Sequence, residues 1–373
     1  MIANGMACPM TLSALEVSTT FATNGSAVEV VPIETGHIND TFFTRDNSDR
    51  HYVLQRINSH VFSDAKSLVR NIQLTTDFVR KKLQQAGVPE IERRVLQLVP
   101  QRTGDWLAEA PQGQFWRMYR YIERAYSVES EPTLEEIYQS AFGFGEFAAS
   151  LAGFPAGVLI PTIPDFHHGP MRFRALCNAV DGDVVGRTRL AGEEIDFITR
   201  HEGSLARPQK LIERGEVPLR VTHNDTKSNN VLLDSGTHKA LCVIDLDTVM
   251  PGLVLYDFGD LVRTTACCAA EDEVDLNKIY VEPDRVRQAT WGFLAGMQDS
   301  LEASERRSLV LGPAYMTLIM ATRFLTDFLQ GDIYFKTHHP NHNLDRCRAQ
   351  IAVVRGLQRL EDEIASMIMA PDE

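Results

Sequence analysis

The spacing of hydrophobic residues differs between the first third of the chain and the rest. Short runs rich in β-branched and aromatic residues, separated by turn residues, predict strands at residues 28–33, 42–44, 51–57, 95–99 and 115–122. Between the third and fourth runs, residues 61–86 repeat apolar side chains at the helical period, and a Gly-Val-Pro segment ends this helix. The pattern therefore predicts an antiparallel sheet with one helix after its third strand.

Helical periodicity dominates the remainder of the chain. Apolar residues recur three to four positions apart at residues 133–153, 173–180, 193–206, 209–214, 284–298, 304–331 and 343–368. Two small hairpins are expected to interrupt these helices around residues 221–263. We therefore predict an α+β protein with two lobes: a small lobe at residues 1–122 with the antiparallel sheet plus helix, and a larger, mostly helical lobe at residues 123–373.

A glycine motif inside one predicted helix needs a separate interpretation. Residues 143–148, GFGEFA, match the spacing of a dinucleotide-binding motif. That motif acts at a turn from a strand into a helix, whereas this one lies within a helical pattern. We therefore predict that these glycines allow close helix packing.

The polar residues with the most informative spacing lie between residues 221 and 263. His223 and Asp225 form a His-x-Asp pair, Asn230 follows five residues after Asp225, and Asp245 closes a later apolar run. This spacing is typical of kinase-type phosphoryl transfer, in which one carboxylate orients the attacking hydroxyl while another carboxylate and an amide hold metal ions on the phosphates. The alternative is a buried His–Asp pair followed by a charged hairpin turn.

Each of these polar side chains has a predicted role. Asp225 is the candidate catalytic base, because a carboxylate accepts the proton of the attacking hydroxyl, and Lys227 is near enough to contact the transferred phosphate. Asn230 and Asp245 are the candidate ligands of Mg²⁺, which prefers oxygen ligands. Asp247 shares a face with Asp245 in an extended chain and is a further candidate metal ligand. ATP and Mg²⁺ are therefore the predicted cofactors.

Other ionisable residues are expected to have structural roles. His223 should hold the backbone of the loop, and Asp257 and Asp260 should orient the loop as hydrogen-bond acceptors, with metal binding as their less favoured role. Three histidines within residues 338–342 have a spacing that resembles a metal site. Because they flank a Pro-Asn turn, we predict a solvated loop there.

Composition and charge narrow the range of partners. The 373 residues carry a formal net charge of −13, which disfavours nucleic acid and anionic membranes as main partners, since both attract basic surfaces. The six cysteines form no C-x-x-C pair, so neither a disulfide framework nor a zinc site is expected. No signal peptide and no run of eighteen apolar residues is visible. We therefore expect a cytoplasmic protein without a transmembrane helix.

Several segments, in the same order along residues 30–360, resemble a known family. They read GHIN, YVLQRIN, RNIQL, VTHNDTKSNNVLLD, IDLDTVMPG, LYDFGD and RFLTDFLQGDIYF. The chain is similar to the N-acetylhexosamine 1-kinases, a group within the aminoglycoside phosphotransferase and choline kinase superfamily. The resemblance implies a protein-kinase-like fold and ATP-dependent phosphorylation of the anomeric hydroxyl of N-acetylglucosamine or N-acetylgalactosamine.

The resemblance also implies roles for residues outside this stretch. Backbone groups of Tyr121, Ile122 and Glu123 would hold adenine. A sugar pocket would be formed by His37, Asn39, Asp225, Arg323, Asp332 and Tyr334. These side chains supply the donors and acceptors that an N-acetyl sugar needs. For Arg323, the alternative is a surface ion pair with Asp327.

One departure from the kinase pattern concerns the phosphate-binding lysine. Gln55 stands in the third strand where kinases place that lysine, and the following helix offers Gln73 rather than a glutamate partner. Gln55 is therefore a candidate nucleotide-binding residue. Either Lys227 and Arg70 supply the missing positive charge, or Mg²⁺ neutralises more of the phosphate charge.

Two further hypotheses stay open beside the sugar kinase. One is a kinase of another small hydroxylated substrate, of the aminoglycoside, choline or homoserine type. The other is a non-catalytic binding module, which the missing strand-three lysine favours and the intact set of Asp225, Asn230 and Asp245 opposes. The expected partners are ATP and a small-molecule sugar. Both a monomer and a dimer are compatible with the sequence.

Overall fold

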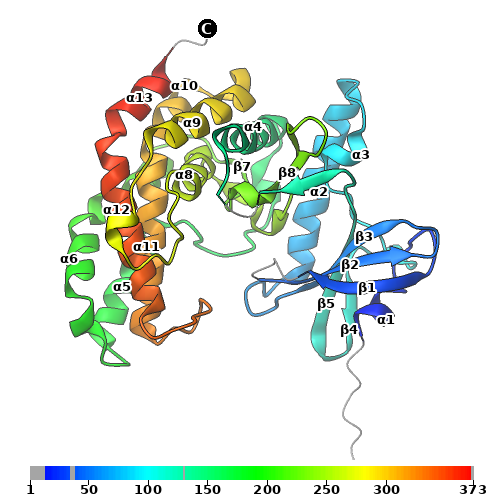
Figure 1. The fold of residues 1–373 in the computed structure, drawn as a ribbon, viewed down its shortest axis with the longest axis horizontal. Coiled ribbons are helices and arrows are strands. Elements are labelled where there is room, and N and C mark those ends of the chain that lie inside the picture. Colours follow the sequence, from blue (N-terminus) through cyan, green and yellow to red (C-terminus); the bar gives the residue numbers. More distant parts are fainter. Residues whose placement is uncertain (1–12, 34–37, 129–130, 371–373) are drawn as a thin grey trace, which may run out of the picture. The chain divides into compact units, whose positions relative to one another are not determined.

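The computed structural model describes residues 13–33, 38–128 and 131–370, and these form two compact units (Figure 1). Unit 1 comprises Met1–Arg124 together with two short segments, Leu159–Ile163 and Asp245–Val249. Unit 2 contains the rest of the chain. The predicted division at residues 122 and 123 stays a prediction, and the sequence did not indicate that two later segments join unit 1.

The sheet of unit 1 is antiparallel and has the strand order β1-β2-β3-β5-β4. Its strands are β1 (Ala27–Ile33), β2 (Asp40–Asp46), β3 (His51–Ile57), β4 (Ala108–Ala110) and β5 (Gln114–Arg120). The predicted strand at residues 95–99 is wrong. That segment adds only the backbone bonds Val99 N–H to Met118 O (2.8 Å) and Arg120 N–H to Gln97 O (2.9 Å) to the edge of β5. β4 pairs with the other end of the same β5 edge. The part of the edge that remains is too short for residues 95–99 to form a strand.

Helix α2 (Ala65–Gln85) follows β3, as predicted, and begins at the cap residue Asp64, whose carboxylate accepts from the Ser67 N–H (3.0 Å). Two short helices, α1 (Ala14–Ser18) and α3 (Ile91–Arg94), complete the unit. The buried Asn71 of α2 holds both added segments: its side-chain nitrogen donates to Ile160 O (2.7 Å) and Val249 O (3.2 Å). One amide thus joins three parts of the chain that lie far apart in sequence.

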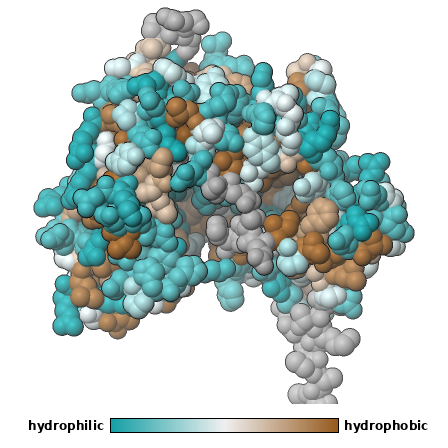
Figure 2. Space-filling model, viewed as in Figure 1, coloured by the Kyte–Doolittle hydropathy of each residue, from teal (hydrophilic) through white to brown (hydrophobic). Residues whose placement is uncertain are grey.

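Hydrophobic residues gather over the sheet of unit 1 in Figure 2. At the edge of this sheet, β1 exposes Val28 and Val31. Pro32, on the same strand, has no N–H to offer a further strand. The proline therefore limits pairing at an edge whose apolar side chains would otherwise favour it.

Unit 2 is mostly helical (Figure 1). Its helices are α4 (Leu134–Ser150), α5 (Gly169–Gly182), α6 (Gly192–Arg200), α7 (Glu202–Glu213), α8 (Val254–Thr265), α9 (Pro283–Met297), α10 (Ala303–Ser308), α11 (Gly312–Gln330), α12 (His342–Arg359) and α13 (Glu361–Met369). The predicted helices at 193–206, 304–331 and 343–368 are each divided. The second of these breaks at the 3₁₀ turn Leu309–Leu311, just before Pro313 in the first turn of α11.

Close packing of α4 against α9 explains the glycine motif. A Cβ added at Gly145 would lie 2.3 Å from Phe293 O, and one at Gly296 would lie 2.2 Å from Phe142 O. The two backbones therefore approach too closely for side chains at these positions. The prediction of helix packing instead of a dinucleotide site is confirmed.

Two small sheets interrupt the helices of unit 2. One has the order β6-β8-β9, formed by Ala125–Ser127, Val231–Asp234 and Ala240–Val243, and the other pairs β7 (Arg220–Thr222) with β10 (Met250–Gly252). Strands β7 and β8 bracket residues 223–230. The short sheets therefore hold both ends of the polar loop.

The segment Ala303–Gln330 is long and apolar enough to span a membrane by length and composition alone. By length and composition, the expectation that the chain has no segment able to span a membrane is therefore not met. However, 72% of its most apolar window is buried inside the protein, among the other helices of unit 2. Core helices of folded proteins share this composition.

Candidate active site

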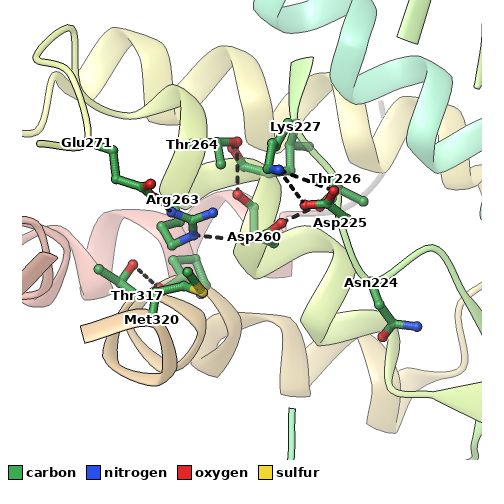
Figure 3. Close-up of polar contacts among 12 residues, drawn as sticks. Asn224, Asp225, Thr226, Lys227, Asp260, Arg263, Thr264, Glu271, Thr317 and Met320 are labelled. Atoms are coloured by element: carbon green, nitrogen blue, oxygen red, sulfur yellow. Dashed lines mark hydrogen bonds and ion pairs between the residues drawn. The ribbon is translucent and has the colours of Figure 1, made fainter. Parts of the chain in front are cut away.

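The loop that follows β7 is held by two carboxylates of α8, of which Figure 3 shows Asp260. Asp257 accepts from the backbone N–H of His223 (2.8 Å) and of Asn224 (2.7 Å). Asp260 accepts from the backbone N–H of Thr226 (3.0 Å). The prediction that these two carboxylates orient the loop is confirmed. Their burial satisfies backbone donors that would otherwise be unpaired.

Asp225 lies between these anchored peptide groups, and 22% of its side chain is exposed. Lys227 Nζ lies 3.0 Å from one of its carboxylate oxygens and 3.2 Å from the other (Figure 3). Burial by itself would raise the pKa of Asp225, but the charge of Lys227 brings that pKa below its usual value. The carboxylate is therefore ionised at neutral pH and can accept a proton.

Asn230 is buried at the end of the same loop, in the 3₁₀ turn Ser228–Asn230. Its side-chain nitrogen donates to the backbone carbonyl of Asp225 (2.9 Å), so its side-chain oxygen faces another direction. The backbone N–H of Ile244 donates to the Asn230 carbonyl (2.9 Å). Asp245 is the next residue along the chain, with φ of 57°. An amide oxygen and a carboxylate are ligand types that suit Mg²⁺.

Asp247 is engaged inside unit 1. Its carboxylate lies 2.5 Å from Arg117 Nη1 and accepts from Asn39 Nδ2 (2.7 Å). Arg117 and Asp247 have only 1% and 3% of their side chains exposed. A metal role for Asp247 would require it to release these partners. Within the described residues, no three His, Cys, Asp or Glu side chains form a metal cluster.

Arg117 is the functional candidate that the sequence analysis missed. It lies opposite Gln55 in the register of β3 and β5, and its Nε and Nη2 donate to Gln55 Oε1 (3.0 and 2.8 Å). A buried guanidinium thus lies beside Gln55, the residue that the sequence pattern aligns with the kinase lysine. The available signal was an arginine within the aromatic strand FWRMYR.

The predicted adenine-binding segment follows β5 in unit 1. The Tyr121 N–H donates to His51 O (3.1 Å), and the Glu123 carbonyl accepts from Arg93. The Glu123 side chain contacts His51 Nδ1 (2.6 Å). These two backbone groups of the segment are therefore already used within the unit, and Ile122 between them is buried.

The predicted sugar residues of unit 2 lie around the C-terminal end of α11. The Arg323 guanidinium lies over the rings of Phe166, Tyr334 and Phe335, at 5.0, 5.5 and 5.3 Å from their centroids. Burial lowers the pKa of Arg323, while the charge of Asp225 opposes that change. The structure thus brings Arg323 within electrostatic reach of the candidate base and places the Tyr334 ring beside Arg323.

The remaining predicted sugar residues have structural partners. Asp332 pairs with Arg187 Nη1 (2.5 Å) and accepts from Asn343 Nδ2 (2.9 Å). Asp327, the alternative partner of Arg323, instead accepts from the backbone N–H groups of residues 333–335. Asn39 Oδ1 accepts from the Asn58 N–H (3.0 Å). His37 lies outside the described residues.

The histidines near residue 340 do not form a fully solvated loop. His342 is buried, and its Nε2 lies 3.0 Å from Asp272. The prediction holds for His338 and His339, which are exposed. Because His342 is the first residue of α12, its pairing with Asp272 attaches the start of this helix to the segment after α8.

Comparison with known proteins identifies the family of the chain and solved structures with a similar fold. Residues 29–287 match the family described as the phosphotransferase enzyme family. An aminoglycoside phosphotransferase from Alicyclobacillus acidocaldarius is 13% identical, with a TM-score of 0.63 over 97% of both chains. A microcompartment-associated aminopropanol kinase is 18% identical, with a TM-score of 0.60 over 94% of this chain and 98% of its own. Choline kinase from Cryptosporidium parvum is 14% identical, with a TM-score of 0.52 over 92% of both chains.

Proposed function

The chain belongs to the phosphotransferase enzyme family, and we propose that it is an ATP-dependent kinase of N-acetylhexosamines that produces the sugar 1-phosphate. One observation carries the proposal most directly: Asp225 is held ionised at the centre of a loop whose backbone is anchored by two carboxylates of α8. A base with a fixed position and an available lone pair is what alignment of a hydroxyl with a phosphoryl group needs.

The residues of the loop suit the proposed cofactors. Asn230 and Asp245 would hold Mg²⁺, which would neutralise charge on the phosphates of ATP. Two protein ligands are in keeping with the usual binding of Mg²⁺, which keeps waters and substrate phosphates as its other ligands. For adenine, we propose the Tyr121 carbonyl and the Glu123 N–H as the backbone groups. The Tyr121 N–H and the Glu123 carbonyl already have partners, His51 and Arg93.

The chain's own residues divide the proposed reaction between them. Asp225 accepts the proton of the anomeric hydroxyl as the sugar oxygen attacks the terminal phosphorus of ATP, and the bond from that phosphorus to ADP breaks. Lys227, 3.0 Å from Asp225, places a positive charge beside the transferred group. Arg323 and Tyr334 bind the sugar, with the guanidinium donating to a sugar oxygen and the ring lying against the apolar parts of the sugar.

The resemblance to N-acetylhexosamine 1-kinases supports the choice of substrate, and the family supports a phosphotransferase of small molecules. The second candidate is a kinase of another small hydroxylated substrate, as aminopropanol and choline kinases share this fold. The lobes proposed are residues 1–122 and 123–373. We also propose that the enzyme acts in the cytoplasm, where ATP is available.

A substrate panel tests the proposal. ADP release is measured with ATP, Mg²⁺ and each of N-acetylglucosamine, N-acetylgalactosamine, aminopropanol, choline, homoserine and an aminoglycoside. N-acetylhexosamines should give the highest kcat/KM, and phosphorus NMR of the product should show a sugar 1-phosphate. Turnover of another acceptor alone would remove the sugar assignment and retain the kinase.

Variants of the base separate chemistry from folding. Asp225→Asn should lower kcat by at least about 10²-fold, because the amide cannot accept the proton. Asp284→Asn, a change of the same kind at the exposed first turn of α9, should leave kcat unchanged. Full activity of Asp225→Asn would show that Asp225 is not the base. For Lys227→Ala, a kcat within a few-fold of wild type would remove its proposed role.

A further inference from the structure

The peptide group that precedes Asp225 is contacted at both ends by histidines. Its carbonyl, which belongs to Asn224, lies 3.0 Å from His167 Nε2, and its N–H, which belongs to Asp225, lies 3.3 Å from His223 Nδ1. The position of the Asp225 side chain depends on the orientation of this peptide plane. Asn224 has φ of 65°, a left-handed conformation that is uncommon outside glycine and needs support from its surroundings.

The chemistry of the contacts determines the tautomer of both rings. A carbonyl oxygen only accepts, so His167 Nε2 must carry a hydrogen. His223 Nε2 faces the Ile244 carbonyl (2.9 Å) and must also carry a hydrogen, and its Nδ1 accepts the Asp225 N–H. Both imidazoles are therefore Nε2–H tautomers, one donating to the peptide and the other accepting from it.

His167 is surrounded by groups that keep its ring in place. Only 6% of the residue is exposed, and its ring lies 4.3 Å from that of Phe166 and 5.4 Å from that of Tyr256. Its own carbonyl accepts from the Tyr315 hydroxyl of α11 (2.6 Å), and that hydroxyl accepts from the Gly169 N–H (3.0 Å). Burial lowers the pKa of His167 to about 4, so the ring is neutral at pH 7.

We propose that His167 is a positioning residue for the base: its Nε2–H fixes the peptide plane before Asp225, and the Tyr315 contact ties that plane to α11, which carries Arg323. The inference rests on the proposed function, because it assigns His167 a task in the reaction of Asp225. The α8 carboxylates hold only N–H groups of the loop. His167 supplies the donor to the Asn224 carbonyl, at the other side of the same peptide group.

Kinetics of two substitutions test this role. His167→Phe keeps an aromatic ring between Phe166 and Tyr256 but removes the donor; it should lower kcat by about 10- to 100-fold, the effect of misplacing a reacting group by around 1 Å, with KM values changed less than threefold. His167→Gln offers an amide N–H and should restore kcat to within about fivefold of wild type. The matched control is His201→Phe, which removes a histidine contact to another backbone carbonyl, Phe197 O (2.8 Å), between α6 and α7.

The outcomes are decisive in both directions. An unchanged kcat in His167→Phe, an equal loss in His167→Gln, or a rise in KM without a fall in kcat would overturn the proposal. An equal loss of kcat in His201→Phe would do the same, since the effect would then be one of general stability.

A wild-type measurement covers the case in which the variants do not fold or no acceptor is found. Nitrogen-15 NMR of histidine-labelled protein should show His167 with a protonated Nε2 and an unprotonated Nδ1, unchanged between pH 5.5 and 8. The opposite tautomer, or titration within this range, would refute the inference. This readout is independent of substrate, so failure of the sugar-kinase proposal and failure of the His167 inference are distinguishable.

Discussion

Removal of one partner from the buried ion pair of unit 1 provides a quantitative test of the structure. Arg117 lies 2.5 Å from Asp247, and both side chains are almost fully buried. In Arg117→Met, the Asn39 side chain is the one side-chain donor to the Asp247 carboxylate that remains among the described residues. Loss of one partner of a buried pair typically costs about 3–5 kcal/mol, because the other charge stays buried without compensation.

Arg117→Met also removes hydrogen bonds from Gln55. Two Arg117 donors reach the Gln55 side-chain oxygen, and both disappear in this variant. The double variant Arg117→Met/Asp247→Leu removes both charges and should recover at least half of the lost stability, since apolar replacement of a buried pair is often close to neutral. The double variant should therefore be more stable than the sum of the two single changes predicts, by more than about 1 kcal/mol.

Urea unfolding followed by tryptophan fluorescence measures these changes. The chain has three tryptophans, and Trp106 and Trp116 belong to unit 1 while the exposed Trp291 belongs to unit 2. In a Trp291→Phe background, the signal therefore reports on unit 1 alone. A midpoint shift equivalent to less than about 1 kcal/mol for Arg117→Met, or no recovery in the double variant, would refute the reasoning.

Two further predictions concern unit 2. Gly145→Ala should destabilise the protein by at least about 2 kcal/mol, because its Cβ would lie 2.3 Å from Phe293 O. The control is Gly203→Ala in α7, where an added Cβ would have no neighbour within 4 Å among the described residues; it should be neutral or stabilising by up to about 1 kcal/mol. Equal urea midpoints for the two variants would contradict the close packing of α4 against α9. Burial raises the pKa of Asp257 to about 6, above its unfolded value near 3.9. The stability that the protonated carboxyl contributes is complete below pH ~3.9 and is lost as pH rises through about 6. The free energy of unfolding of wild type relative to Asp257→Asn should therefore fall by roughly 3 kcal/mol in total, about 2 kcal/mol of it between about pH 4 and 6, and level off above about pH 7. Urea midpoints at several pH values measure this difference, and a rise with pH would reverse the sign and contradict the pKa assignment.

Local sequence patterns were sufficient for much of the fold. The alternating runs of β1, β2, β3 and β5 and the helical period of α2 were correctly predicted, because each depends on residues close together in sequence. The segment at residues 95–99 was not. Its apolar composition indicated burial correctly, but whether it forms a strand depends on how much of the β5 edge β4 occupies.

The central polar loop was also determined largely by the sequence, since Asp225, Lys227 and Asn230 lie within one short turn between two strands. Tertiary structure decided the partners of these residues and of Asp247. Arg117 is 130 positions from Asp247 in the chain, and His167 contacts a residue 57 positions away. No periodicity encodes such pairs, because they depend on how strands and helices pack after they form. The sequence therefore indicated which side chains carry the proposed chemistry, and only the folded chain showed what holds them in position.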